Sequence, residues 1–233
     1  MNTKHPYCTA IIVAAGKGTR MGGRVSKQFL LLEGREILAH TIDAFEKSPL
    51  INRIVLVANE TEAVEQIIAK NHYQKIYTVV QGGAERQDSV KNGLDAIPGE
   101  TDIVLIHDGV RPFVTEKMLK EAIAAAQTED GAIVGMPVKD TIKICDKRRC
   151  VIATPNRESL MQIQTPQVFR VDLIIAAYKK AYANDFHGTD DASVAEFAGL
   201  HPRVVAGSYR NIKITTAEDM EIAAAFLREG IHS

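Results

Sequence analysis

Several features are scarce in this chain of 233 residues, and each scarcity excludes a class of protein. The chain has no tryptophan and only three cysteines, Cys8, Cys145 and Cys150, which argues against a disulfide framework. A formal net charge of only -1 gives no indication of a nucleic-acid or membrane surface. No apolar run is long enough to span a bilayer, and residues 1–7 lack the apolar core of a secretion signal. We therefore expect a cytoplasmic protein with free thiols, which binds neither nucleic acid nor membranes.

The composition that remains is ordinary for a globular protein. Hydrophobic residues make up 45% of the chain and charged residues 24%. The length suffices for one substantial α/β core and is close to the largest size expected of a single core. The seven histidines are scattered, without the spacing of a zinc site. Because linkers, repeats and low-complexity segments are also lacking, we expect residues 1–233 to form one domain.

Apolar runs typical of buried strands alternate with segments of helical periodicity. The first part of the chain predicts strands at 9–13, 53–57, 76–80, 102–106 and 132–138, and helices at 36–47, around 64–68, at 86–97 and at 116–127. The last part predicts a strand at 164–169, helices at 171–183, 190–197 and about 220–227, and short strands near 204–205 and 211–214. This alternation indicates an α/β fold with a mostly parallel sheet that is covered by helices on both faces.

One segment interrupts the alternation. Two β-like runs, 141–145 and 151–153, surround a charged turn without an intervening helix, which predicts an antiparallel hairpin arm at about residues 139–156. Two strands alone are only marginally stable in water. The arm therefore lies either on the main body or against a second subunit, and we favour the second subunit. Cys145 and Cys150 flank the turn, where two facing thiols could meet.

The loop after the first predicted strand has the composition of an anion-binding turn. It comprises Ala14-Ala15-Gly16-Lys17-Gly18-Thr19-Arg20-Met21 and continues to Ser26-Lys27-Gln28. Glycines allow close approach of a ligand, backbone N–H groups in such turns bind anions, and Arg20 and Lys27 add charges that suit a polyphosphate. The spacing fits neither a Walker loop nor a dinucleotide fingerprint. A structural turn, or a site for another anion, is the alternative.

Polar residues also follow two later strands. Gly82-Gly83 precede Ser89, where a base or phosphate could dock, although Asp88 or Ser89 could simply cap the next helix. Asp108 and Gly109 follow the fourth strand, where a carboxylate can hold a divalent metal or a ribose hydroxyl, and Arg111 can bind a second anion. The alternative is an Asp108–Arg111 ion pair that closes the loop. Ligands of open α/β sheets bind at the carboxyl ends of strands, so these loops predict one shared site.

Taken in order, the motifs carry a resemblance to a known family. The glycine loop with Lys27-Gln28, then Gly82-Gly83-x-x-Arg86-x-x-Ser89 and His107-Asp108-x-x-Arg111-Pro112, resemble nucleotidyltransferases that activate sugar and polyol phosphates. The later motifs are similar to those of the 2-C-methyl-D-erythritol 4-phosphate cytidylyltransferases: Pro137-Val138-Lys139-Asp140-Thr141-Ile142-Lys143, Asn156-Arg157, Gln164-Thr165-Pro166-Gln167, Thr189-Asp190-Asp191-Ala192-Ser193 and Asn211-Ile212-Lys213. The resemblance covers essentially the whole chain. It implies a Rossmann-like nucleotidyltransferase domain whose hairpin arm serves dimerisation.

The resemblance also implies a reaction and a set of site residues. The reaction is a Mg²⁺-dependent transfer of CMP from CTP to a polyol phosphate, in non-mevalonate isoprenoid biosynthesis. The implied catalytic residues are Arg20, Lys27, Arg157 and Lys213, and the implied substrate ligands are Arg111, Thr141, Thr165 and Thr189. CTP would contact Ala14, Ala15, Gly16, Gly18, Gly83, Ser89, Asp108 and Gly109, with Asp108 also a candidate metal ligand. The arm would cross to a partner subunit of a homodimer, so that Thr141 and Arg157 serve the neighbouring active site.

Two other interpretations stay open. A cytidylyltransferase for another polyol phosphate, such as ribitol 5-phosphate, would share several motifs. Such relatives tend to have Ala-Gly-Gly in place of Ala14-Ala15-Gly16 and to differ in the motif at 137–143, so both segments favour methylerythritol phosphate. A non-catalytic nucleotide-binding module would be expected to have lost some of the four implied catalytic residues, and all four are present.

Overall fold

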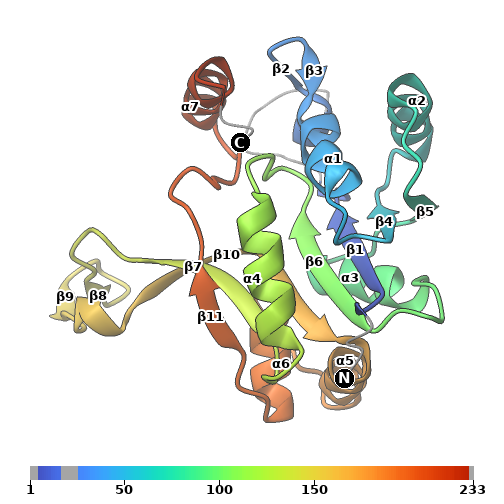
Figure 1. The fold of residues 1–233 in the computed structure, drawn as a ribbon. Coiled ribbons are helices and arrows are strands. Elements are labelled where there is room, and N and C mark those ends of the chain that lie inside the picture. Colours follow the sequence, from blue (N-terminus) through green and yellow to red (C-terminus); the bar gives the residue numbers. More distant parts are fainter. Residues whose placement is uncertain (1–4, 17–25, 231–233) are drawn as a thin grey trace.

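A seven-stranded sheet forms the centre of the structure, a computed structural model that describes residues 5–16 and 26–230. The strand order is β11-β7-β10-β6-β1-β4-β5 (Figure 1). The parallel strands are β1 (Cys8–Val13), β4 (Arg53–Val57), β5 (Ile76–Val80), β6 (Ile103–Asp108), β7 (Ala132–Pro137) and β11 (Arg203–Ala206). The predicted mostly parallel sheet is confirmed, with β10 (Met161–Arg170) antiparallel to both of its neighbours. No crossover helix lies between β7 and β10, so the chain re-enters the sheet at the same end of the strands at which it left β7.

Helices cover both faces of this sheet, as predicted. The helices α1 (Ile37–Lys47), α2 (Thr61–Asn71) and α4 (Glu116–Ala126) pack on one face, and α3 (Arg86–Asp95), α5 (Val171–Ala183) and α6 (Asp191–Ala198) on the other. Side chains of β1 alternate between the two cores: Ala10 and Ile12 face the first, and Ile11 faces the second. The central strands β1, β4 and β6 are apolar along most of their length because both of their faces are buried. Within the described residues, every helix is too short or too polar to cross a membrane.

The outer elements were predicted less well. The small hairpin of β2 (Leu31–Leu32) and β3 (Arg35–Glu36), and the short helical turns η2 (Lys27–Phe29) and η3 (Arg157–Ser159), were not predicted. Helix α7 (Ala217–Arg228) was predicted, and it packs in a third apolar cluster. The strand predicted at 211–214 is wrong, because isolated hydrogen bonds rather than a ladder hold this segment. Asn211 Nδ2 donates to the Thr165 carbonyl at 3.0 Å, and the Ile214 N–H donates to the Val110 carbonyl at 2.9 Å.

The predicted hairpin is formed by β8 (Ile144–Cys145) and β9 (Val151–Ala153). It projects from the end of β7 (Figure 1), and residues 139–154 are all exposed, so the arm does not lie on the described main body. The Asp146 carboxylate closes the turn by accepting the N–H groups of Arg148 and Cys150 at 2.9 and 2.8 Å. Both arm cysteines are free thiols, and Cys145 lies opposite Val151 rather than opposite Cys150.

Candidate active site

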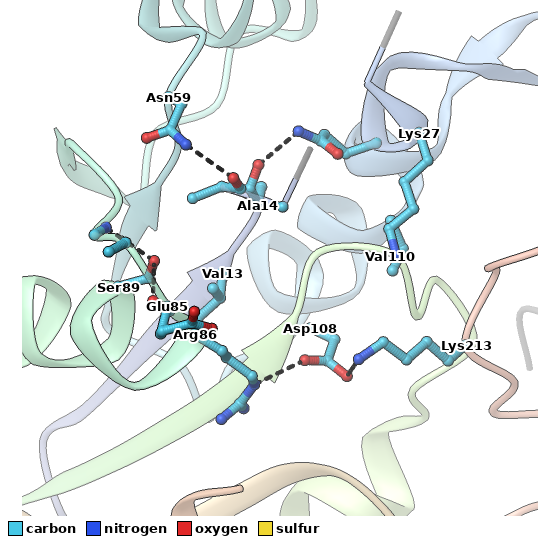
Figure 2. Close-up of a pocket in the computed structure, with 15 residues that line it drawn as sticks. Val13, Ala14, Lys27, Asn59, Glu85, Arg86, Ser89, Asp108, Val110 and Lys213 are labelled. Carbon is cyan, nitrogen blue, oxygen red and sulfur yellow. Dashed lines mark hydrogen bonds and ion pairs between the residues drawn. The ribbon is translucent and has the colours of Figure 1, made fainter. Parts of the chain in front are cut away.

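The strand order places a crevice between the carboxyl ends of β1 and β6. From β1 the chain continues outward through β4 and β5 on one side, then returns to add β6 on the other side. Ligands of open α/β sheets bind at such a reversal. A cavity of about 400 Å³ lies there, within the usual range for small-molecule sites (Figure 2). Its wall comes from the ends of four strands and two other segments, through Ala14, Asn59, Gly83, Asp108, Lys27 and Lys213 among others.

Side-chain amides fix the start of the first loop. Gln28 is 1% exposed and donates through Nε2 to the Ala14 carbonyl at 2.7 Å. Asn59, which follows β4, donates through Nδ2 to the Ala15 carbonyl at 2.9 Å. The predicted CTP contacts Ala14, Ala15 and Gly16 therefore line the cavity as a defined wall. The predicted residues Gly18 and Arg20 lie outside residues 5–16 and 26–230.

Glycines in the second loop allow protein segments to pack closely against each other. A Cβ atom on Gly82 would lie 2.2 Å from the Ala15 Cβ, and one on Gly83 would lie 2.2 Å from the Asp88 Cβ. Ser89 Oγ accepts the Gly83 N–H at 3.0 Å and donates to the Glu85 carbonyl at 3.1 Å. The capping alternative is confirmed for Asp88, which accepts the Glu85 N–H at 3.0 Å in a capping box of α3. Gly83 and Ser89 both line the cavity, as predicted for CTP contacts.

Three cations surround the Asp108 carboxylate. Lys213 Nζ lies 2.9 Å from Oδ2, Arg111 Nε lies 3.3 Å from Oδ2, and Arg86 Nε lies 3.4 Å from Oδ1. In Figure 2, Lys213 and Arg86 approach this carboxylate from opposite sides. Burial raises the pKa of Asp108, but the three positive charges outweigh burial and hold that pKa well below its usual range. The alternative of an Asp108–Arg111 ion pair is thus confirmed, but as one contact of a larger cluster. This cluster keeps Asp108 ionised and makes it a weak proton acceptor.

A buried histidine fixes the backbone beside Asp108. His107 is 0% exposed, and its Nε2 lies 2.9 Å from the Arg111 carbonyl, which can only accept a hydrogen bond. Nε2 therefore carries the proton, and Nδ1 accepts the Thr165 hydroxyl at 3.0 Å. The same Thr165 oxygen accepts the Asp108 N–H at 3.1 Å. Thr165 therefore positions the end of β6 and directs its own proton to His107. Its predicted contact with substrate stays a prediction.

Acid should destabilise the fold through His107. Burial lowers the pKa of His107 from 6.5 to about 4, so the unfolded chain binds a proton at a higher pH than the folded protein does. We expect the free energy of unfolding to fall by up to about 3 kcal/mol as the pH is lowered from about 6.5 to about 4. Urea titrations across this range measure the slope. Asp108, whose folded pKa is held below its ordinary value of 3.8, contributes mainly below about pH 4 and only a small part of the change within this window.

His107→Gln serves as the control for this pH dependence. Glutamine keeps a donor for the Arg111 carbonyl but cannot take up a proton in this range. The variant should be less stable at neutral pH, yet its stability should change much less between pH 6.5 and 4. An equal slope in the variant would assign the acid sensitivity to other groups.

The remaining predicted residues fall into two groups. Lys27 and Lys213 line the cavity, and the Gly109 N–H donates to the Val13 carbonyl at 2.8 Å beside it. Arg111 Nη1 donates to the Asn211 carbonyl at 2.9 Å and so supports the segment that carries Lys213. The other three predicted residues, Thr141, Arg157 and Thr189, are exposed and stand outside the cavity wall of the same chain. Arg157 Nη1 donates to the Lys139 carbonyl at 2.8 Å at the base of the arm.

Three residues of this region were missed. Asn59 comes two residues after β4, at the same edge of the sheet at which β6 ends with Asp108, so the position of strand ends could have identified it. Arg86 was noted only as part of a motif, although it lines the cavity and contacts Asp108. Asp191 contacts Arg86 from the far side of the cavity wall, 105 positions along the chain, and no local pattern indicates that contact.

The donor atoms fit a magnesium ion that arrives with a nucleotide. Among the described residues there is no group of three or more metal-binding side chains that could form an all-protein site. Mg²⁺ is commonly held by one or two carboxylates together with water and substrate phosphates. Asp108 lines the cavity, and among the described residues its Oδ1 contacts only Arg86 Nε, at 3.4 Å, which leaves lone pairs for such an ion.

Comparison with known proteins agrees with this arrangement. The IspD family model, described as 2-C-methyl-D-erythritol 4-phosphate cytidylyltransferase, matches residues 8–229. Enzymes of that name from Geobacter metallireducens and Geotalea uraniireducens are each 50% identical, over 94% of this chain and 97% and 96% of theirs. A crystal structure of 4-diphosphocytidyl-2C-methyl-D-erythritol synthase from Anaerococcus prevotii is 37% identical, covers 97% of this chain and 100% of its own, and has a TM-score of 0.85. The chain therefore belongs to the IspD family of 2-C-methyl-D-erythritol 4-phosphate cytidylyltransferases.

Proposed function

We propose that this protein transfers CMP from CTP to 2-C-methyl-D-erythritol 4-phosphate, a step of non-mevalonate isoprenoid biosynthesis. The products are 4-diphosphocytidyl-2-C-methyl-D-erythritol and pyrophosphate. One observation carries the proposal: Lys27 and Lys213 come from distant segments, yet they line one cavity with the loop at 14–16 and with Gly83 and Ser89. In this proposal the cytosine lies toward Gly83 and Ser89, and the phosphates lie toward the two lysines.

The proposed chemistry needs charge stabilisation more than proton transfer. A phosphate oxygen of the polyol phosphate forms a bond to the α-phosphorus of CTP, and the bond from that phosphorus to pyrophosphate breaks. The attacking oxygen is already anionic, so no strong general base is required. This agrees with the surroundings, because Asp108 is a weak proton acceptor and both ring nitrogens of His107 are engaged. Positioning and preorganised positive charge then supply the catalysis.

The charged residues Lys27, Lys213 and Asp108 of the cavity each have a proposed role in that reaction. Lys27, together with Arg20, stabilises the charge that develops on the α-phosphate and on the leaving pyrophosphate. Lys213 is already oriented by Asp108 at 2.9 Å and would hold the substrate phosphate in line. Asp108 and the nucleotide phosphates would hold Mg²⁺, which when bound neutralises charge on the triphosphate.

We also propose a homodimer in which each arm completes the partner's site. The arm exposes Ile144 at 51%, Val151 at 59% and Ile152 at 66%, and contiguous exposed apolar side chains are typical of interaction surfaces. A two-stranded hairpin also needs a surface to pack on. Two-fold symmetry would bring Thr141 and Arg157 of one subunit to the cavity of the other. Residues 1–233 then act as one domain with its arm at about 139–156, and we expect that domain in the cytoplasm.

A pyrophosphate-release assay tests the reaction directly. With CTP and Mg²⁺, we expect release of pyrophosphate and formation of a CDP-alditol with methylerythritol phosphate, and much slower release with ribitol 5-phosphate. Faster turnover of ribitol 5-phosphate would instead support the second polyol-phosphate interpretation. Binding of CTP without any turnover across a panel of polyol phosphates would support a non-catalytic module.

A further inference from the structure

We infer that Asp191 is a positioning residue of this active site and that it acts through Arg86. The inference rests on the proposed function for its kinetic test. Asp191 is the first residue of α6, is 0% exposed and is absent from the cavity wall. Arg86 does line the cavity, at the start of α3. The ion pair between them joins α3, which follows the loop with Gly82 and Gly83, to α6, which begins two residues after Thr189.

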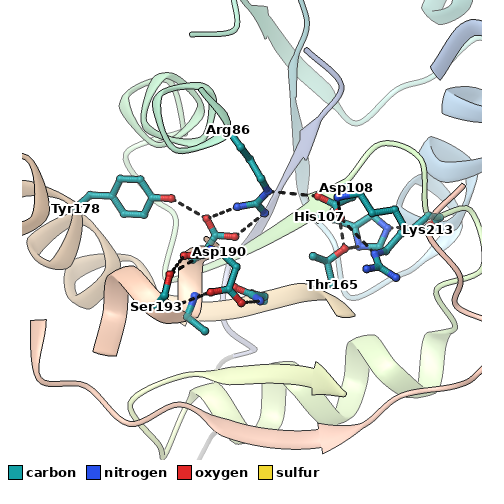
Figure 3. A network of polar contacts seen from close by, with 12 residues as sticks. Arg86, His107, Asp108, Thr165, Tyr178, Asp190, Ser193 and Lys213 are labelled. Carbon is teal, nitrogen blue, oxygen red and sulfur yellow. Dashed lines mark hydrogen bonds and ion pairs between the residues drawn. The ribbon is translucent and has the colours of Figure 1, made fainter. Parts of the chain in front are cut away.

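The geometry of Arg86 lets one guanidinium contact two carboxylates at once. Its Nη1 and Nη2 donate to Asp191 Oδ1 and Oδ2 at 3.1 and 2.7 Å, while Nε points the other way and donates to Asp108 Oδ1 at 3.4 Å. Figure 3 shows Arg86 reaching toward Asp108 on one side and toward the carboxylate contacted by Tyr178 on the other. The guanidinium is planar and rigid, so a two-point contact at one end fixes its rotation as well as its place. Asp191 thereby fixes the direction in which Nε meets Asp108.

Asp191 is itself immobilised. The Tyr178 hydroxyl, from α5, donates to Asp191 Oδ1 at 2.7 Å, and Tyr178 is 3% exposed. The N-terminus of α6 also favours a carboxylate at this position. Hydrogen bonds therefore run without a break from Tyr178 on α5 to Asp191, from Asp191 to Arg86 and from Arg86 to Asp108.

The pair is better explained by orientation than by stability. A buried ion pair is weak evidence for stability, because apolar side chains of similar volume often stabilise a fold equally well. Neither apolar side chains nor a lysine could contact both carboxylates in fixed directions. Burial lowers the pKa of Arg86, but the charges of Asp191 and Asp108 outweigh burial and raise it, so the guanidinium stays charged. Without Asp191, this cation could turn toward Asp108 or the nucleotide phosphates and disturb the charge that surrounds the reacting phosphorus.

Steady-state kinetics of a double-mutant cycle tests the inference. Asp191→Asn keeps the shape but removes the charge, and we expect kcat to fall about 10- to 100-fold, because small misplacement of charged groups costs about that much. The KM for CTP should change less than about threefold, and Asp191→Glu should recover part of the loss. The Arg86→Lys variant should show a similar fall in kcat. The kcat of the double variant should lie within about threefold of the kcat of the less active single variant. If the two fold-losses in kcat instead multiplied, the residues would act independently and the inference would be overturned.

Ser193→Ala is the matched control in the same helix. Its hydroxyl supports the start of α6 by donating to the Asp190 carbonyl at 2.8 Å and accepting the Asp190 N–H at 3.2 Å, and both contacts lie within its own turn rather than with Arg86. The variant should lose thermal stability but keep kcat within about twofold. Equal losses of kcat in Ser193→Ala and Asp191→Asn, at matched losses of melting temperature, would make Asp191 structural only and overturn the inference. If Asp191→Asn does not fold, Tyr178→Phe removes only the hydroxyl that anchors Asp191 and should give a smaller fall in kcat with an unchanged KM.

A measurement without substrates separates this inference from the proposed function. ¹⁵N spectra of the arginine side chains should show slowly rotating Nη groups for Arg86, assigned by their loss in Arg86→Lys. Those signals should be lost in Asp191→Asn and kept in Ser193→Ala. Unchanged Arg86 signals in Asp191→Asn would overturn the inference whatever the enzyme's substrate. A wild-type protein that released no pyrophosphate but showed this pattern would contradict the proposed function alone.

Discussion

Lys27→Ala is expected to lower kcat about 10²- to 10³-fold, the scale for loss of one preorganised charge stabiliser. Lys27 begins the turn η2 and lines the cavity beside the loop at 14–16, where the phosphates of a bound nucleotide would lie. Its ammonium would interact most strongly with charge that develops as pyrophosphate leaves, and less with the ground state. The KM for CTP should therefore rise much less than kcat falls. Steady-state release of pyrophosphate at varied CTP measures both constants.

Lys117→Ala is the control for the loss of a lysine as such. The Lys117 side chain is 81% exposed on α4, and its ammonium lies 3.9 Å from the Glu121 carboxylate in the next turn. Its removal should leave kcat and KM unchanged, because exposed pairs of this kind contribute little. A Lys27→Ala enzyme with normal kcat and a raised KM for CTP would make Lys27 a binding residue and would contradict the charge-stabilisation mechanism.

The site could be predicted as far as strand ends determine it. Apolar runs located the central strands to within about two residues, and the residues at or just beyond the carboxyl ends of β1, β5 and β6 do meet in one cavity. Lys213 is different, because it lies on a segment that was predicted as a strand. A short apolar run such as 211–214 has the composition of a strand, but whether it pairs with a neighbour depends on the rest of the fold. Only the family motif indicated that its lysine belongs to the site.

The contacts that orient these residues could not be predicted. Arg86 and Asp191 lie far apart in the sequence, and each would be equally plausible as a solvated charge on an amphipathic helix. The same holds for His107. Its burial follows from its place in the central strand β6, but its tautomer, with the proton on Nε2, is set by the Arg111 carbonyl that faces this nitrogen. Patterns in sequence record which face of an element is buried. Pairing of polar groups across elements is decided by packing, and it appears only in the structure.

Two inactive variants should recover activity when they are mixed. If each arm serves the neighbouring subunit, Arg157→Ala removes a catalytic residue from the partner's site, whereas Lys27→Ala removes one from its own. A heterodimer of the two variants then has one site with both defects and one site with neither. Free exchange of equal amounts gives heterodimers in about half of the dimers, and therefore about a quarter of the wild-type activity per subunit. Each parent variant alone should be nearly inactive in the pyrophosphate-release assay.

The outcome depends on which subunit the arm serves, so the test distinguishes a shared site from a merely structural arm. Residues 139–154 are exposed in the chain, and Arg157 directly follows the arm, with its guanidinium 2.8 Å from the Lys139 carbonyl rather than at the cavity. An Arg157 that acted within its own subunit would leave both sites of the heterodimer defective. Absence of recovery, with heterodimers verified by native mass spectrometry, would therefore contradict the shared site. As a control, mixing Lys27→Ala with Lys213→Ala should restore nothing, because both lysines line the cavity of the same chain and every site would lack one of them.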